Sequence, residues 1–146
     1  MISDLLANCC NARSLLGAAA LATLVACAPS DIATGSCHSI MMATGDPWEC
    51  TVKGAIVGRR SSITFDTESR NQIAEVDFEL RVTKGSLRVY YGDLTGARQI
   101  VVTPSEPASV AMKTKMNPRD RSFTMHFEPV GGRVEGLTGT VKYKTP

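Results

Sequence analysis

The sequence predicts an all-β protein, built as a single antiparallel β-sandwich of about eight short strands, with a closed barrel as the alternative. Three observations lead to this fold class. Apolar and polar residues alternate from Trp48 onward, clusters of turn residues interrupt the alternation at regular intervals, and no stretch has the 3.6-residue period of a helix. The prolines suit strand edges and corners, which favours the sandwich over the barrel.

The clearest predicted strand covers residues 74–83. Its apolar residues share one parity, and its polar residues share the other. The first set is Ala74, Val76, Phe78, Leu80 and Val82; the second is Glu75, Asp77, Glu79, Arg81 and Thr83. A strand with this pattern has one face in the core and one face in water.

The remaining strands follow the same alternation in chain order. We expect strands over residues 50–57 and 62–66, and then five more that are recognised by their apolar positions. These positions are Leu87, Val89 and Tyr91; Ile100 and Val102; Val110, Met112 and Met116; Phe123, Met125 and Phe127; and Val141 and Tyr143. Turns are expected at Gly92–Asp93, Gly96, Pro104, Pro107, Asn117–Pro118 and Gly131–Gly132.

An apolar run near the N-terminus is typical of an export signal. Residues 15–26 contain one polar side chain, Thr23, and follow Arg13. A membrane-spanning helix needs about 20 apolar residues, so this run is too short to cross a bilayer and matches the h-region of a signal peptide.

The residues that close this run, Leu24-Val25-Ala26-Cys27, resemble the lipobox of bacterial lipoproteins. The resemblance implies cleavage before Cys27, attachment of a diacylglycerol to its thiol, and further fatty acylation. In bacteria with two membranes, lipoproteins with aspartate directly after the lipidated cysteine are generally retained in the inner membrane. Ala28 occupies this position here, which points to the outer membrane. The alternative is cleavage after Ala28 by the ordinary signal peptidase, which would release a soluble secreted or periplasmic protein.

The five cysteines fit an exported protein. Cys9 and Cys10 fall within the predicted signal, and Cys27 is the lipidation site that the resemblance implies. Cys37 and Cys50 remain as a predicted disulfide pair, with two buried free thiols as the alternative. The spacing matches neither a Cys-x-x-Cys redox motif nor a zinc site.

Three regions follow from these features. Residues 1–26 form the signal peptide, residues 27–36 the lipidated cysteine with a tether, and residues 37–146 the β-sandwich domain, irregular as far as Pro47. The formal net charge is +2, and both signs are mixed along the chain, so we expect no nucleic-acid partner.

Candidate binding residues are few. Glu75, Asp77 and Glu79 form an acidic row, which carboxylate chemistry or calcium binding could use. The alternative is a solvated face opposite Arg88, Lys113 or Lys115. Arg59 and Arg60 mark a hairpin tip that could contact lipid phosphates, and residues 119–121 mark a second tip; solvated turns are the alternative.

No arrangement predicts catalysis. His38 and His126 have no local acid or nucleophile partner, and we predict no cofactor, no metal site and no enzyme. The predicted function is a lipid-anchored binding or structural module of the bacterial cell envelope with a protein partner there. The alternatives are an inhibitor or exclusion factor directed against an enzyme or a phage and, third, a wall-acting hydrolase.

Overall fold

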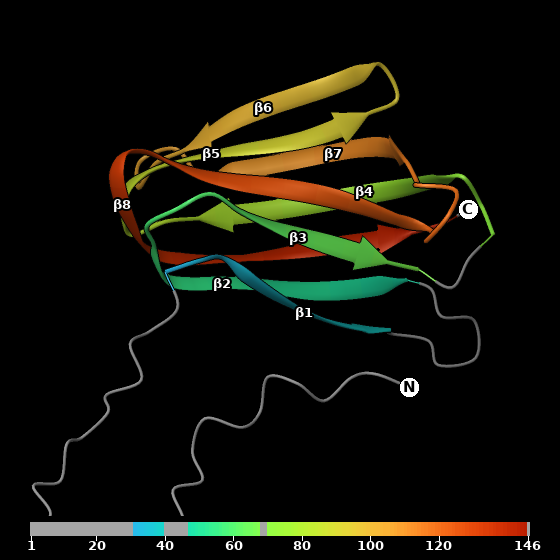
Figure 1. The fold of residues 1–146 in the computed structure, drawn as a ribbon, viewed down its shortest axis with the longest axis horizontal. Helices are drawn as coiled ribbons and strands as arrows, with labels where there is room; N and C mark the ends of the chain where they lie inside the picture. Colours follow the sequence, from blue (N-terminus) through green and yellow to red (C-terminus); the bar gives the residue numbers. More distant parts are fainter. Residues whose placement is uncertain (1–30, 40–46, 68–69, 146) are drawn as a thin grey trace, which may run out of the picture.

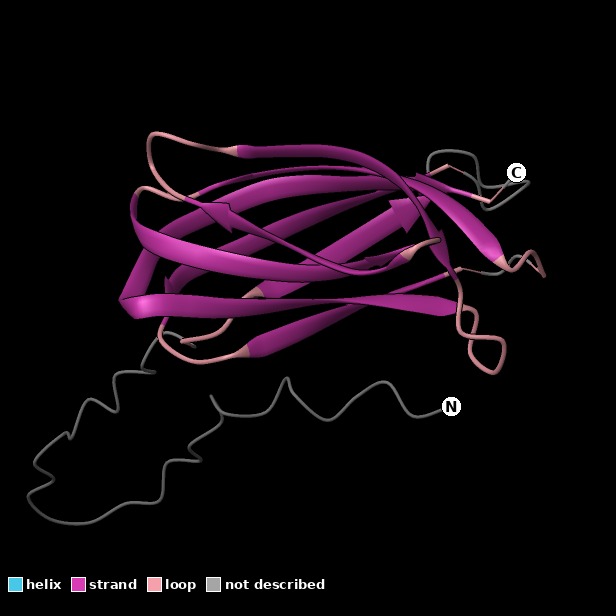
Figure 2. Ribbon diagram, turned by 90° about the horizontal axis from the view of Figure 1, so that it is seen from above, coloured by secondary structure: helices cyan, strands magenta, loops and turns pink. Residues whose placement is uncertain are grey.

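The fold is an antiparallel β-structure, as the sequence predicts. The computed structural model describes residues 31–39, 47–67 and 70–145. These residues form strands joined by loops, and none of them is helical (Figure 2). The strands are β1 (Thr34–Ser39), β2 (Trp48–Val57), β3 (Ser61–Asp66), β4 (Ile73–Arg81), β5 (Lys84–Asp93), β6 (Gly96–Val102), β7 (Ala108–Lys115) and β8 (Ser122–Lys144). No helix long and apolar enough to cross a membrane occurs in this part of the chain.

Strand β8 organises the sandwich because it takes part in both layers. Its first part, residues 122–130, pairs with β3 and β5, and its second part, residues 134–144, pairs with β2 and β4. The layers are therefore β3–β8–β5–β6 and β1–β2–β8–β4–β7 (Figure 1). The two are continuous in hydrogen bonding, as one sheet folded across β8.

The sequence predicts two separate strands where the structure has β8. The predicted turn at Gly131–Gly132 is a bend within one strand of 23 residues. Both glycines have positive φ, 73° and 144°, which residues with a Cβ rarely adopt. The strand can therefore turn sharply from one layer into the other while its pairing resumes directly after the bend.

The core lies between the two layers and is closed by aromatic contacts. Phe78 of β4 meets Tyr91 of β5 edge to face, with ring centroids 5.3 Å apart. Phe123 meets Tyr143 in the same way at 5.2 Å. The Tyr143 hydroxyl donates a hydrogen bond of 2.6 Å to the Asp66 backbone carbonyl, so this buried phenol is satisfied.

The first strand was not predicted. The sheet begins at Thr34, within the segment that the sequence assigns to the tether, and β1 pairs with β2 over six residues. The predicted disulfide is present: Cys37 lies opposite Cys50 in this pairing and is bonded to it. Backbone pairing and the disulfide hold a strand whose own side chains are mostly exposed.

The two predicted hairpin tips are connections between layers. Residues 58–60 join β2 to β3, and residues 116–121 join β7 to β8, but neither pair of strands is hydrogen-bonded to each other. Local alternation predicts where a strand ends but not which strand lies beside it, so the hairpin expectation was wrong at both places.

Candidate functional site

The outer face of the β1–β2–β8–β4–β7 layer carries the predicted acidic row. Glu75, Asp77 and Glu79 project outward from β4, while Val76, Phe78 and Leu80 are buried between them. Each carboxylate has a neighbour on β8 and one on β7 at the same level. These pairs are Lys144 and Lys113 for Glu75, Lys142 and Ala111 for Asp77, and Thr140 and Ser109 for Glu79.

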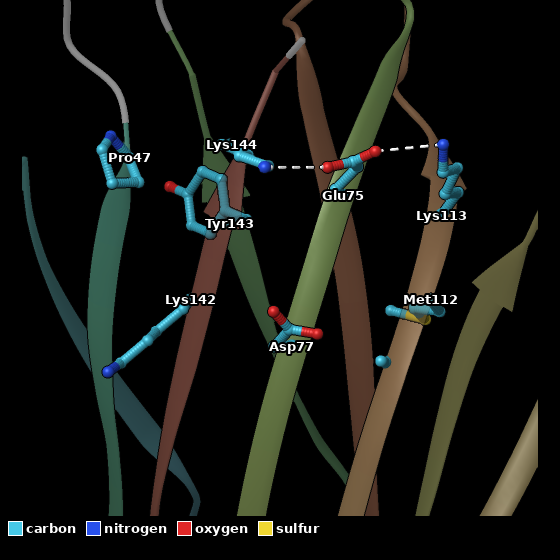
Figure 3. A pocket seen from close by; sticks show the side chains of 9 residues that line it. Pro47, Glu75, Asp77, Met112, Lys113, Lys142, Tyr143 and Lys144 are labelled. Atoms are coloured by element: carbon cyan, nitrogen blue, oxygen red, sulfur yellow. Dashed lines mark ion pairs between the residues drawn. The ribbon is translucent and has the colours of Figure 1, made fainter.

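Glu75 is neutralised from both sides. Its Oε1 lies 3.0 Å from Lys113 Nζ, and its Oε2 lies 3.1 Å from Lys144 Nζ (Figure 3). The hydrogen bond from Lys113 lowers the pKa of Glu75 most, followed by the bond from Lys144. Of the three cations considered from sequence, Lys113 does lie opposite the row, whereas Lys115 lies opposite Ile73 and Arg88 belongs to the other layer.

Asp77 is in a different environment. Lys142 lies directly opposite it on β8, but the lysine side chain extends toward β2, where Nζ is 3.6 Å from Glu49 Oε2 (Figure 3). Within the described part of the chain, Asp77 has no ion pair or hydrogen bond to its side chain. On the other side, Ala111 is too small to fill the space beside it.

A groove results from this arrangement. It has a volume of about 620 Å³ and is lined by Pro47, Glu75, Asp77, Ala111, Met112, Lys113, Lys142, Tyr143 and Lys144. A second depression of about 310 Å³ continues along β4 past Asp77 to Glu79, Ser109 and Thr140. Because small side chains flank the row on β7, the groove follows β4 across the face.

The groove combines acceptors and donors without an aromatic platform. Asp77 and Glu79 offer carboxylate oxygens, and Lys113 and Lys144 offer ammonium groups at its rim. All eight aromatic residues of the chain lie in the described part, and each of them is buried or half-buried. A ligand would therefore be held by hydrogen bonds and charge rather than by stacking on a flat ring.

The other predicted residues do not join this groove. His38 is on β1 opposite Glu49, and His126 is in the other layer opposite Ser62 and Tyr90. Arg59 pairs with Asp31 at 3.1 Å, and Arg60 packs over the Tyr90 ring at 5.4 Å. Cys27 lies outside the described residues.

From the sequence, Lys142, Lys144 and Ala111 were not placed beside the acidic row. They come from β8 and β7, and only the pairing of strands distant in the chain brings them beside β4. The alternation Lys142-Tyr143-Lys144 was the available signal, since it places both lysines on one outward face. Among the described residues, no group of three or more His, Cys, Asp or Glu side chains is arranged to hold a metal ion.

Comparisons with known proteins give a likeness of fold. No family model and no curated protein matches the chain. Among solved structures, the chain is similar to the PRD1 vertex protein P5, with a TM-score of 0.45 and 9% identity over 77% of this chain and 95% of that one. It is similar to a chain of the disulfide-linked pili of Bacillus endospore appendages, with a TM-score of 0.41 and 16% identity over 84% and 96%.

A third similar structure is the family 11 carbohydrate-binding module of a Clostridium thermocellum cellulosomal cellulase. Its TM-score is 0.35, at 10% identity over 91% of this chain and 97% of that one. At these scores and identities the likeness concerns the arrangement of strands and does not extend to function. The class that the fold defines is an antiparallel β-sandwich, and its function has to be argued from its own surface.

Proposed function

We propose that this chain is a non-catalytic binding module of the bacterial cell envelope, anchored by lipid on Cys27, whose β4 groove takes an extended, hydroxyl-rich polymer such as an envelope glycan. One observation carries the binding proposal: an open groove crosses the outer face at Asp77, a carboxylate with no cation paired to it among the described residues. Sugar hydroxyls both donate and accept hydrogen bonds, so they suit a groove that offers carboxylates and ammonium groups side by side.

The geometry favours binding over hydrolysis. Glycoside hydrolysis uses two carboxyl groups that flank the scissile bond, one of them with a raised pKa. Asp77 and Glu79 project from the same strand into solvent and offer no such flanking pair. The two histidines lie in different layers, so they do not supply an acid and base to a common substrate.

Titration of the protein with a panel of soluble peptidoglycan fragments and neutral and acidic polysaccharides, monitored by backbone amide NMR shifts, tests the groove. A ligand should move the amides of β4, β7 and the second part of β8 together. Asp77→Ala should weaken binding at least tenfold. Glu106→Gln, in an exposed turn outside the groove, is the matched control and should leave affinity unchanged. Shifts confined to other strands would contradict the assignment.

The anchor has its own test. Cys27→Ala, expressed in a bacterium, should leave the membrane fraction and lose labelling by a fatty-acid probe. Wild-type protein carries the label if the lipobox is used. Equal labelling of both proteins would remove Cys27 from the proposal.

A protein partner is the second candidate, and the edge strand β6 favours it. Among the described residues, β6 pairs only with β5, so its other edge presents unpaired backbone groups, and Val101 on it is 42% exposed. Neither lysine nor proline interrupts this strand to discourage strand addition. A stoichiometric protein captured from envelope extract by the wild type, and lost when Val101→Lys is used, would support an inhibitor or adaptor.

A further inference from the structure

The N-terminal end of the described chain is fixed to one end of the sandwich. The Gly58 amide donates a hydrogen bond of 2.9 Å to the Asp31 carbonyl, and Arg59 pairs with the Asp31 carboxylate. Two residues later, the Ala33 amide donates to Ser61 Oγ at 3.2 Å. The position of Asp31 is therefore set by the connection between β2 and β3.

Chain length then limits where a lipid on Cys27 can lie. Cys27 precedes Asp31 by four residues, and four residues span at most about 14 Å whatever their conformation. With the lipid in a bilayer, the β2–β3 end of the sandwich stays close to the membrane surface. This step rests on the lipid anchor of the proposed function.

The surface held there is basic. Arg59 pairs with Asp31, and Arg133 lies beside Asp31 at Gly58. Arg60 follows in the same connection, with its guanidinium over the Tyr90 ring. A Cβ added at Gly58 would lie 3.3 Å from Asp31 Oδ2 and 3.8 Å from Arg133 Cγ, so the side chains of Asp31 and Arg133 lie side by side there. The bend of β8 adds Val130, which is 36% exposed.

Two other charged groups lie at this end of the sandwich. Lys84 Nζ is 3.1 Å from Glu135 Oε1, so these two charges neutralise each other. The turn between β6 and β7 at the same end carries Glu106 (Figure 1).

The groove lies at the opposite end. Pro47, at its rim, directly precedes β2, and β2 runs from Trp48 to Val57 at the anchored end (Figure 1). A strand rises about 3.3 Å per residue, so the length of β2 puts the Pro47 rim of the groove about 30 Å from the anchored end. An end that rests on the bilayer would therefore direct the groove away from it.

We propose that the surface formed by Asp31, Arg59, Arg60, Val130 and Arg133 docks on an anionic lipid bilayer and holds the sandwich upright, with the β4 groove facing away from the membrane. The lipid supplies attachment, and the basic surface supplies orientation. Arg60 and Arg133 have no carboxylate paired to them among the described residues, and Arg60 lies over the Tyr90 ring, so both arginines keep their charge for lipid phosphate. Together they should favour the docked orientation about 30-fold, which corresponds to about 1 kcal/mol for each arginine near an anionic surface.

Trp48, the only tryptophan of the chain, reports this orientation because it lies at the groove end of β2. Lipidated protein is reconstituted into vesicles whose headgroups carry an energy acceptor. One set is pure phosphatidylcholine, and the other has equal parts of phosphatidylcholine and phosphatidylglycerol. Energy transfer from Trp48 should be lower on the anionic vesicles, where the upright orientation dominates, and high salt should remove the difference.

Charge reversal gives the decisive comparison. Arg60→Glu with Arg133→Glu should raise transfer on anionic vesicles to the level on neutral ones, and Arg60→Gln with Arg133→Gln should raise it partway. Arg70→Glu with Arg119→Glu makes the same charge change at the opposite end and should leave transfer low. Far-UV circular dichroism checks that each variant remains folded.

The outcomes separate this proposal from the anchor. If wild-type protein does not float with either vesicle set, the proposed lipid anchor is contradicted, and the proposed orientation fails with it. Protein that floats but shows equal transfer on both sets, or that responds equally to reversal at either end, would overturn the docking surface while the anchor stands.

Discussion

The two faces of strand β4 differ in burial and in charge, although the residues that form them alternate along one backbone. Toward the core, Val76, Phe78 and Leu80 are fully buried and contact the second layer. Toward solvent, Glu75 is neutralised by two lysines, whereas Asp77 and Glu79 have no such partners among the described residues. Residues one position apart thus differ in role: the inward ones stabilise the core, and the outward ones line the groove that we propose as a binding site.

Because the two faces are separate, the fold can be tested independently of its function. In a helix, residues three and four apart share a face, and core and groove residues would mix. In a strand they separate by parity, so a substitution on one face should leave the other intact.

Leu80→Ala should lower the free energy of unfolding by about 2–5 kcal/mol, because it removes a fully buried side chain and leaves a cavity. Glu79→Ala, one residue away on the solvent face, is the control and should change it by less than about 0.5 kcal/mol. Urea unfolding of both variants measures the contrast. Comparable losses at the two positions would mean that Glu79 is buried or engaged, contrary to the separation of faces.

Reduction of the Cys37–Cys50 disulfide should cost about 3 kcal/mol, the entropy of closing a loop of this length in the unfolded chain. β1 should be affected first, since β2 is the one strand that it pairs with in the described part of the chain. Hydrogen exchange after reduction should increase in the amides of β1 before those of β4. If β4 exchanged as early as β1, the bridge would support the whole core rather than its edge.

The sequence predicted the local features and missed the non-local ones, for a physical reason in each case. Alternation at residues 74–83 set which side chains of β4 face inward, because the two-residue period is local. β1 was missed because Thr34–Ser39 contains no apolar alternation, and its pairing with β2 and the disulfide hold it instead. β8 was divided in two because Gly131–Gly132 is typical of a turn and bends a continuous strand equally well.

The candidate site was predicted only in part. Lys142, Lys144 and Ala111 were missed because they lie beside Asp77 and Glu75 only through the pairing of strands that are distant in the chain.

Acid should weaken the fold through two outward carboxylates. Asp93 accepts hydrogen bonds from Thr95 and from Arg98, and these depress the pKa of its carboxyl strongly; Glu75 is shifted in the same direction by its lysines. A depressed pKa in the folded state means that stability is fully present above the ordinary pKa and is lost as the pH falls through the folded one. Stability should therefore decline as the pH drops below 4.5 for Glu75 and below 3.8 for Asp93.

Thermal unfolding between pH 7 and pH 2 measures this loss. Asp93→Asn keeps an acceptor for the Thr95 and Gly96 amides but removes the charge that faces Arg98. The variant should be less stable than the wild type at pH 7 and should lose less on acidification. A variant with the wild-type slope would assign the acid response to other carboxylates.

The smallest stability effect is expected where the binding effect is largest. Asp77 is exposed, has no partner among the described residues, and lies between Glu75 and Glu79 on the same face. Asp77→Ala should change the free energy of unfolding by less than about 0.5 kcal/mol, and removal of a like charge beside two others can make the change slightly favourable. Urea unfolding measures it on the same protein whose ligand affinity is tested. A marked loss of stability would show that Asp77 supports the sheet, in which case weakened binding by the variant would no longer identify the groove as the site.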